Sequence, residues 1–205
     1  MVVFAALGNL GIQTTSFVAV LGAMGLAIGM ALKDTFSSVG AGILIVSFKP
    51  FGVGDSINTS GVAGTVESIN IFSTVLKTGD NRRIIIPNSK IISNNIVNES
   101  AKKVRRVELI FGIGYDDDLK KAKTILEEIV DNEPKILKSP TPVVAVCELA
   151  ASSVNFTVRA WVKTPDFTEV QFILNETVKL KFDEEGISIP YPQLEVTQKN
   201  SEAVK

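Results

Sequence analysis

The 205-residue sequence contains no histidine and a single cysteine, Cys147. The absence of histidine excludes Ser-His-Asp and Cys-His catalysis and any histidine-ligated metal. One cysteine excludes a disulfide within the chain and a cysteine-rich zinc site. The net charge of −1 gives no basic surplus for nucleic-acid binding. We therefore expect a protein that is not an enzyme and that needs no cofactor or metal.

Charge is missing from the first 32 residues, and all 43 charged side chains lie between Lys33 and Lys205. A transmembrane helix needs about 20 mostly apolar residues. The stretch from Leu10 to Leu32 is long enough, and its core from Phe17 to Leu32 is wholly apolar. A signal peptide is the first alternative, but no basic region precedes the run and the run is too long. A buried helix of a soluble protein is the second alternative.

The charges that follow the apolar segment indicate its orientation. From Lys33 to Ile113 there are 10 basic and 6 acidic residues, a local excess of four positive charges. Basic residues close to a membrane span favour the cytoplasmic side. We therefore expect the C-terminal body to be cytoplasmic.

Small residues are unusually frequent within the predicted span. Small side chains let helices approach closely in lipid, where packing replaces the hydrophobic drive. They occupy several faces, which suits a helix with neighbours on both sides in a ring of identical helices. The predicted packing residues are Ala19, Gly22, Ala23, Gly25, Ala27 and Gly29.

Two bulky residues, Leu26 and Met30, share one helix face at a spacing of four. In a ring of helices they would form two apolar constrictions, which can stop ions by dewetting. The alternative for this pair is exposure to lipid, and the spacing alone does not decide between the two.

Polar residues interrupt the apolar pattern at Lys33-Asp34, and Ser37-Ser38 and Gly40-Ala41-Gly42 follow. A second apolar run, Ile43 to Phe48, is too short to span a membrane and ends at Pro50. Together with the expected turn before it, we interpret this run as a bent continuation of the helix near the membrane interface. Residues 1–50 form the first predicted part of the chain.

The remainder of the sequence predicts two folded modules. Residues 51–106 carry short strand patterns separated by glycines, which indicate a small β-barrel or sandwich. Residues 107–188 follow a β-α-β-β-α-β order, which is typical of a ferredoxin-like α/β domain. The second helix should end at Gly186. Residues 189–205 form a tail with a short strand expected at residues 194–197.

Motifs distributed along the chain resemble the bacterial small-conductance mechanosensitive channel (MscS) family. Singly several of them are weak, but their order and spacing are specific. They comprise Gly11 to Thr14, Val20 to Ala27, Phe48 to Asp55, Gly61 to Val66, Ile71 to Thr74, Ile86 to Asn88, Ala150 to Phe156 and Gly186 to Gln193. The resemblance completes the predicted fold class. It is an α+β membrane protein with a kinked pore-lining helix, an Sm-like β-barrel domain, a ferredoxin-like domain and a short C-terminal strand.

The resemblance also implies a function. Members are homoheptamers of the inner membrane that open under membrane tension and release ions and small osmolytes on hypo-osmotic shock. Their partners are therefore other copies of the chain, membrane lipids and permeating solutes. The two constriction positions of the best-known members fall on Leu26 and Met30.

Two departures from the family pattern affect this expectation. At the main kink, where well-studied members have glycine, this chain has Asp34, which with Lys33 would lie at the inner pore mouth. A second hinge candidate, Gly42, is retained. The family also has two transmembrane helices before this segment, so we expect the chain to be part of a longer protein.

Two other functions are compatible with the sequence. The β-domain resembles the Sm-like barrel, so a membrane-anchored RNA-binding protein is one alternative, although no stacking-aromatic pattern supports it. A structural scaffold without a pore is the other. The run Asp116-Asp117-Asp118 suggests either a cation site or an acidic helix N-terminus.

Overall fold

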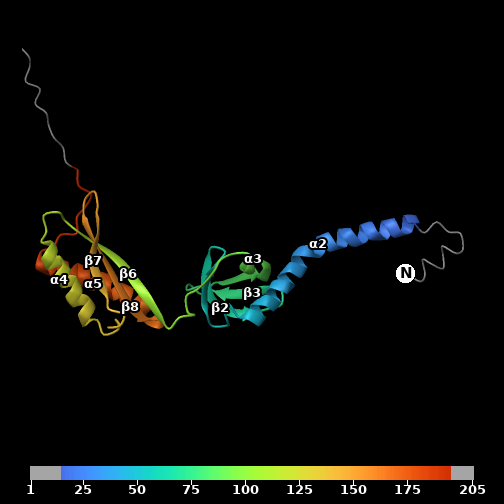
Figure 1. The fold of residues 1–205 in the computed structure, drawn as a ribbon, viewed down its shortest axis with the longest axis horizontal. Helices are drawn as coiled ribbons and strands as arrows, with labels where there is room; N and C mark the ends of the chain where they lie inside the picture. The colour runs from blue at the N-terminus through green and yellow to red at the C-terminus, as the bar shows by residue number, and fades with distance from the viewer. Residues whose placement is uncertain (1–14, 195–205) are drawn as a thin grey trace, which may run out of the picture. The chain divides into compact units, whose positions relative to one another are not determined.

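We describe residues 15–194 in a computed structural model of the chain (Figure 1). The chain divides into two compact units, residues 1–101 and residues 102–205. The first unit contains a long helix and a β-domain, and the second contains a mixed α/β domain. The expected motif residues 11–14 lie outside the described part.

The first unit begins with α2, Thr15–Phe48, a helix of 34 residues. This helix is long and apolar enough to cross a membrane, and none of its most apolar stretch of 18 residues is buried within the described structure. At a rise of about 1.5 Å per residue, α2 is about 50 Å long, whereas a bilayer core is about 30 Å thick. About 20 of its residues therefore suffice to span the core, and the rest of the helix is free for other contacts.

The turn expected between Lys33 and Gly42 is not present. Helix α2 continues through Lys33-Asp34 and through Gly40-Ala41-Gly42 to Phe48, and Figure 1 shows its axis curving along its length. Ser38, Ala41 and Gly42 are not turn residues here, because they lie where the helix packs against the β-domain, whereas Gly40 is exposed. Four residues of α2 are buried: Ser38, Ala41, Gly42 and Ile45.

The β-domain is a five-stranded antiparallel sheet in the order β4-β3-β2-β1-β5. The strands β1 to β4 form a meander, and β5 returns to pair with β1. The strands are β1 (Ser56–Thr59), β2 (Val62–Ile69), β3 (Ser73–Lys77), β4 (Arg83–Pro87) and β5 (Ile96–Asn98). A short helix, α3 (Asn88–Ile92), follows β4 directly. The core of the domain includes Ile45 from α2, which ties the helix to the sheet.

A buried amide organises the contact between α2 and the β-domain. The Asn88 side chain is fully buried, donates to the carbonyls of Asn70 (2.9 Å) and Ile71 (3.0 Å), and accepts from the Thr74 hydroxyl at 2.9 Å. Gly42 lies directly against this group. A Cβ atom at Gly42 would be 2.5 Å from the Ile71 carbonyl oxygen and 2.7 Å from the Asn88 amide nitrogen. The close approach therefore requires glycine.

The second unit contains a three-stranded antiparallel sheet in the order β6-β8-β7, with two helices. Its elements are β6 (Val104–Ile113), α4 (Leu119–Asn132), β7 (Val143–Leu149), β8 (Val154–Lys163), the 3-10 helix η1 (Thr164–Asp166) and α5 (Phe167–Glu185). The order of these elements confirms the first five elements of the predicted β-α-β-β-α-β arrangement. The strand expected from Val107 begins earlier, at Val104, because residues 104–106 pair with residues 161–163 of β8.

Two ends of the second unit have the expected chemistry. Asp118 caps α4 by accepting from the amides of Lys120 (2.9 Å) and Lys121 (3.1 Å). The acidic run Asp116-Asp117-Asp118 therefore leads into a helix N-terminus, which is the second of the two interpretations given above. Gly186 ends α5 in the left-handed conformation, with φ 71°. The strand expected at residues 194–197 lies outside the described part except for Leu194, which is not in a strand.

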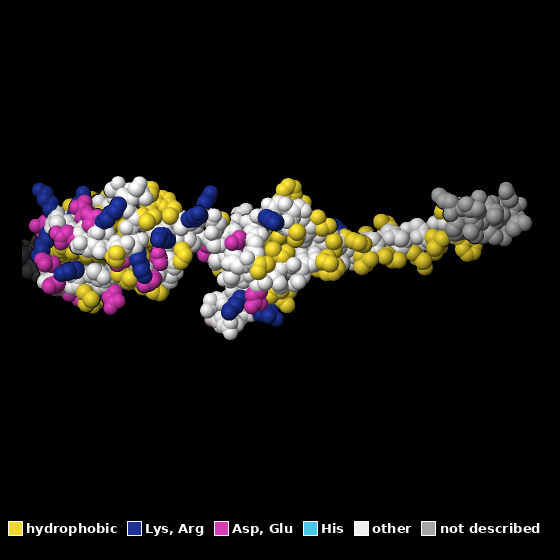
Figure 2. All heavy atoms as spheres, turned by 90° about the horizontal axis from the view of Figure 1, so that it is seen from below, with side chains coloured by type: hydrophobic (Ala, Val, Ile, Leu, Met, Phe, Trp, Pro, Cys, Tyr) yellow, Lys and Arg dark blue, Asp and Glu magenta, His cyan; other side chains and the backbone are white. Residues whose placement is uncertain are grey.

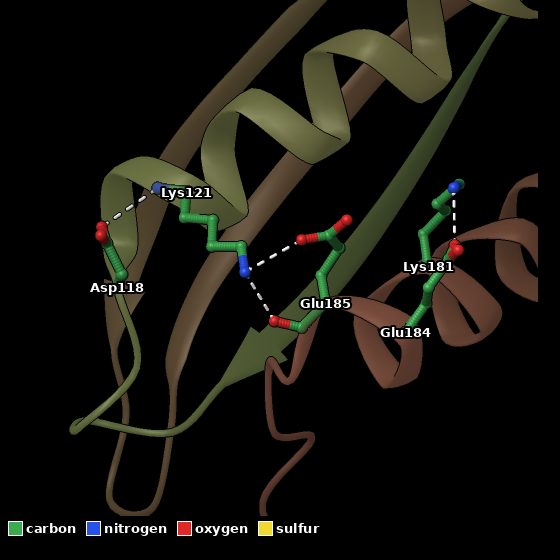
Figure 3. A network of polar contacts seen from close by, with 5 residues as sticks. All are labelled: Asp118, Lys121, Lys181, Glu184 and Glu185. Atoms are coloured by element: carbon green, nitrogen blue, oxygen red, sulfur yellow. Dashed lines mark hydrogen bonds and ion pairs between the residues drawn. The ribbon is translucent and has the colours of Figure 1, made fainter.

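An ion pair joins the beginning of α4 to the end of α5 (Figure 3). The Lys121 ammonium donates to the Glu185 carbonyl at 2.7 Å and lies 2.9 Å from its carboxylate. The carbonyl contact satisfies a free group at the helix C-terminus, where positive charge is also favoured. The hydrogen bond from Lys121, followed by its charge, lowers the pKa of the Glu185 carboxyl.

We predict opposite effects of alanine at two neighbouring glycines. Gly42→Ala should destabilise the docking of α2, because the new Cβ meets a backbone carbonyl and overpacking costs about 1–3 kcal/mol. Gly40→Ala is the matched control, since nothing lies within 4 Å of its Cβ position. Alanine there should be neutral or stabilising. Thermal unfolding of the purified protein in detergent checks both, and equal midpoints for the two variants would contradict the packing assignment.

We also predict a specific role for the Lys121 ammonium. Lys121→Met should speed amide hydrogen exchange at the end of α5 by less than about tenfold, because an exposed ion pair contributes little. Lys123→Met is the control, since the Lys123–Glu127 pair lies within α4 alone. The pKa of the Glu185 carboxyl is lowered in the folded protein. The stabilisation that its carboxylate adds to the contact with Lys121 is therefore present at neutral pH and is lost as pH falls through that pKa. Unchanged exchange in α5 would count against the bridge.

Candidate functional site

The N-terminal half of α2, which we call the upper half, comprises residues 15–32 and has three kinds of surface. Leu26 and Met30 define the first of these surfaces. Both side chains are strongly exposed, at 66% and 64%. Each residue advances a helix by about 100°, so Met30 lies only about 40° from Leu26. The structure therefore places the two predicted constriction residues on one face, which we call the front face.

Small residues lie on both flanks of the front face. Counted from Leu26 at about 100° per residue, the three glycines fall on one side and two alanines on the side of Met30. The glycine flank comprises Gly22, Gly25 and Gly29, and the alanine flank comprises Ala23 and Ala27. A Cβ atom at any of the three glycines would meet nothing within 4 Å in the single chain. Ala19 lies on the front face itself. Both flanks thus offer room for a neighbouring helix.

The back of α2 carries large apolar side chains. Met24 and Ile28 lie about 160° from Leu26 and are 57% and 60% exposed, and Phe17 lies opposite it. On the face drawn in Figure 2, apolar side chains run along the helix and charged ones gather over the folded units. A bulky back suits lipid or further helices, whereas the front face is a narrow bulky strip between small flanks. This pattern favours a pore-facing front over lipid exposure of Leu26 and Met30.

The C-terminal half of α2, residues 33–48, which we call the lower half, shows which side of the helix faces the β-domain. The buried residues Ser38, Ala41, Gly42 and Ile45 lie between about 60° and 160° from Leu26, in the direction of Met30. The Ser38 and Ser89 hydroxyls are 2.9 Å apart, which joins this face to α3. Docking on the β-domain therefore holds one side of the helix and leaves the front face free.

The two charged residues in the middle of α2 point in different directions. Lys33 lies about 20° from Leu26, on the front face, whereas Asp34 lies about 80° away, towards the docked side. Asp34 lines an open hollow of about 730 Å³ together with Ser38 and Lys90. Both hinge candidates, Asp34 and Gly42, lie inside a continuous helix. Gly42 has a close contact that explains glycine there, and Asp34 has none.

Three residues that position this surface were missed at the level of sequence. Ser38, Asn88 and Ser89 hold α2 against the β-domain. Asn88 entered the sequence analysis only as the last residue of a family motif, Ile86 to Asn88. An asparagine that follows proline at the end of a strand, at the first position of a short helix, was the available signal. Ser38 and Ser89 have no distinguishing sequence pattern.

Comparison with known proteins is consistent with this architecture. Residues 1–33 match the family model described as mechanosensitive ion channel, transmembrane helices 2/3. Residues 34–101 match its beta-domain, and residues 107–189 match the model described as mechanosensitive ion channel MscS, C-terminal.

Individual relatives cover nearly the whole chain. An uncharacterized MscS family protein of Synechocystis is 47% identical over 190 residues, which is 93% of this chain and 64% of the relative. The small-conductance mechanosensitive channel of Helicobacter pylori is 37% identical over 201 residues, which is 98% of this chain and 73% of the relative. The chain thus spans about two thirds of the length of such relatives.

Solved structures give the same result. The crystal structure of Helicobacter pylori MscS in its closed state superposes with a TM-score of 0.90 at 37% identity, covering 97% of this chain and 79% of that one. Arabidopsis thaliana MSL1 shares the fold, with a TM-score of 0.77 at 20% identity. The chain is therefore a membrane protein with the predicted α+β architecture, and it belongs to the MscS family of mechanosensitive ion channels.

Proposed function

We propose that this chain forms the pore and the cytoplasmic body of a channel that opens under membrane tension. On hypo-osmotic shock it would release ions and small osmolytes. The observation that carries the proposal is the surface of α2, with a narrow bulky front between two small flanks and a bulky back. The family to which the chain belongs supports the same function.

A single helix cannot enclose a pore, so the function requires several copies of the chain. Cyclic symmetry presents the same face of each helix to the axis. The glycine flank of one α2 can then pack against the alanine flank of the next, because within residues 15–194 neither flank is covered. By its family we propose a homoheptamer, although the number seven follows from no distance in one chain.

The front face provides the closure in this proposal. Rings of Leu26 and Met30 narrow the pore with apolar side chains, and such a constriction stops ions when water leaves it. Met30 is unbranched and flexible, so its ring is more deformable than a ring of leucines. Tilting or rotating the helices moves both rings outward and rehydrates the pore.

Tension acts as a shift between two states. Stretching favours whichever state occupies more membrane area, which needs no bound ligand. The described part of the span, from Thr15 to Leu32, contains no charge, so this part offers voltage nothing to act on. Lipid is therefore the partner that transmits the stimulus.

We place the protein in the bacterial inner membrane with both folded units in the cytoplasm. The excess of basic residues after the span supports this orientation. Permeating ions and osmolytes, membrane lipids and other copies of the chain are the proposed partners. Nucleic acid is not among them, since the net charge is −1.

One prediction of this function is that membrane tension alone opens the pore. The complete parent protein, reconstituted in liposomes of pure lipid, should show discrete current steps when suction is applied to excised patches. Only the bilayer and the protein are present, so tension alone would open the pore. Silence from a folded, oligomeric preparation would reject tension gating and favour a scaffold without a pore.

Another prediction of this function is that the front face of α2 lines the pore. Met30→Ser should give a leaky or easily opened pore, with opening at rest raised more than about tenfold, because hydrating a side chain of methionine's size costs about 1.5–3 kcal/mol. Met24→Ser is the matched control, since it makes the same change on the back of the helix. Patch recordings of the suction needed for opening compare the two.

Three outcomes of this comparison are informative. A large effect of Met30→Ser with a small effect of Met24→Ser supports the assigned pore face. Equal effects would contradict it. A change in thermal stability without any change in conductance or threshold for Met30→Ser is the result expected of a scaffold.

A further inference from the structure

Lys33 and Asp34 are adjacent in sequence and opposite in charge, yet they lie on different sides of α2. The angular difference between neighbours on a helix is about 100°. Both side chains are exposed. Within residues 15–194 neither forms an ion pair, so the two charges are not neutralised by contacts inside the chain.

The docking of α2 decides which of the two charges shares the front face. Gly42 against Ile71 and Asn88, and Ser38 against Ser89, hold the side of the helix that lies about 60–160° from Leu26. Asp34 falls within that range and lines the hollow that also contains Lys90. Lys33 falls outside it.

The front face continues below Met30 with Lys33 and then Ser37. At about 100° per residue these lie about 20° on either side of Leu26, so the strip of Leu26, Met30, Lys33 and Ser37 is nearly straight. Lys33 follows the Met30 position within one turn, and Ser37 is small. The first charge that an ion meets below the apolar constriction is therefore positive.

We infer that Lys33 is a charge-selecting residue of the pore, which favours small anions over cations, while Asp34 contributes little because it faces the β-domain. This inference rests on the proposed channel function and on the pore-facing front. In a pore narrow enough for the ammonium groups to lie within one Debye length of its axis, about 8 Å, their charges act on a passing ion. They raise the local concentration of chloride and lower that of potassium.

The test is the reversal potential of the open channel in patches of the complete protein with a KCl gradient. Lys33→Gln should lower the ratio of chloride to potassium permeability by at least about threefold, because every copy in the ring loses a charge and even one charge several ångströms away changes the local concentration of an ion in water about threefold. Lys33→Glu should lower it further, and Lys33→Arg should preserve it. The differences should shrink as the salt concentration is raised on both sides.

Asp34→Asn is the matched control, because it removes the adjacent charge of opposite sign. We expect a much smaller change of the ratio for this variant. An unchanged ratio in Lys33→Gln would overturn the inference, and so would a change in Asp34→Asn as large as that in Lys33→Gln. Absence of any current from the unmodified protein would instead reject the proposed channel function.

A second measurement avoids dependence on the folding of a charge variant. Lys33→Cys is made together with Cys147→Ser, because Cys147 is the one cysteine of these 205 residues and is exposed, and with serine at any cysteine elsewhere in the complete protein. A negatively charged thiol reagent added to the cytoplasmic side of an open channel should lower the chloride preference in the same patch. A neutral reagent of similar size should not. Equal effects of both reagents, or no effect of the charged one, would contradict a Lys33 side chain in the ion path.

Discussion

The contact of Gly42 with the β-domain is the constraint on which the rest of the account depends. The missing side chain lets α2 approach the Ile71 carbonyl and the buried Asn88 amide, and the Ser38–Ser89 hydrogen bond lies one turn earlier. These contacts fix the rotation of α2 about its own axis. Since a helix keeps its angular order along its length, the same contacts determine which residues of the upper half are free.

That rotation connects the two halves of the helix functionally. Leu26, Met30 and Lys33 share the side that the β-domain leaves open, whereas Asp34 turns towards it. In the proposed channel, a constriction and a charge ring would then follow from one docking geometry. A movement of the β-domain and a rotation of the proposed pore face would be coupled for the same reason, because α2 runs without a break from Thr15 to Phe48.

The sequence predicted the parts of the fold that depend on local pattern. The apolar helix, the two helices of the second unit and the Gly186 cap could all be predicted from composition and spacing. The close packing expected of the small residues in the span stays a prediction. The turn before Gly42 was wrong because serine and glycine also serve close packing, and only a partner that lies far away in sequence reveals which. Asn88 was missed for the same reason. The pore face itself remains a proposal, since the partners that would cover it belong to other copies of the chain.

A structure of the whole protein in lipid nanodiscs, determined by single-particle cryo-electron microscopy, tests the central claim most directly. The account predicts a closed ring in which Leu26 and Met30 lie nearest the symmetry axis, with Gly42 still against Asn88. Met24 and Ile28 should face away from the axis. A ring in which Met24 and Ile28 line the axis, or in which α2 has turned away from the β-domain, would contradict the account.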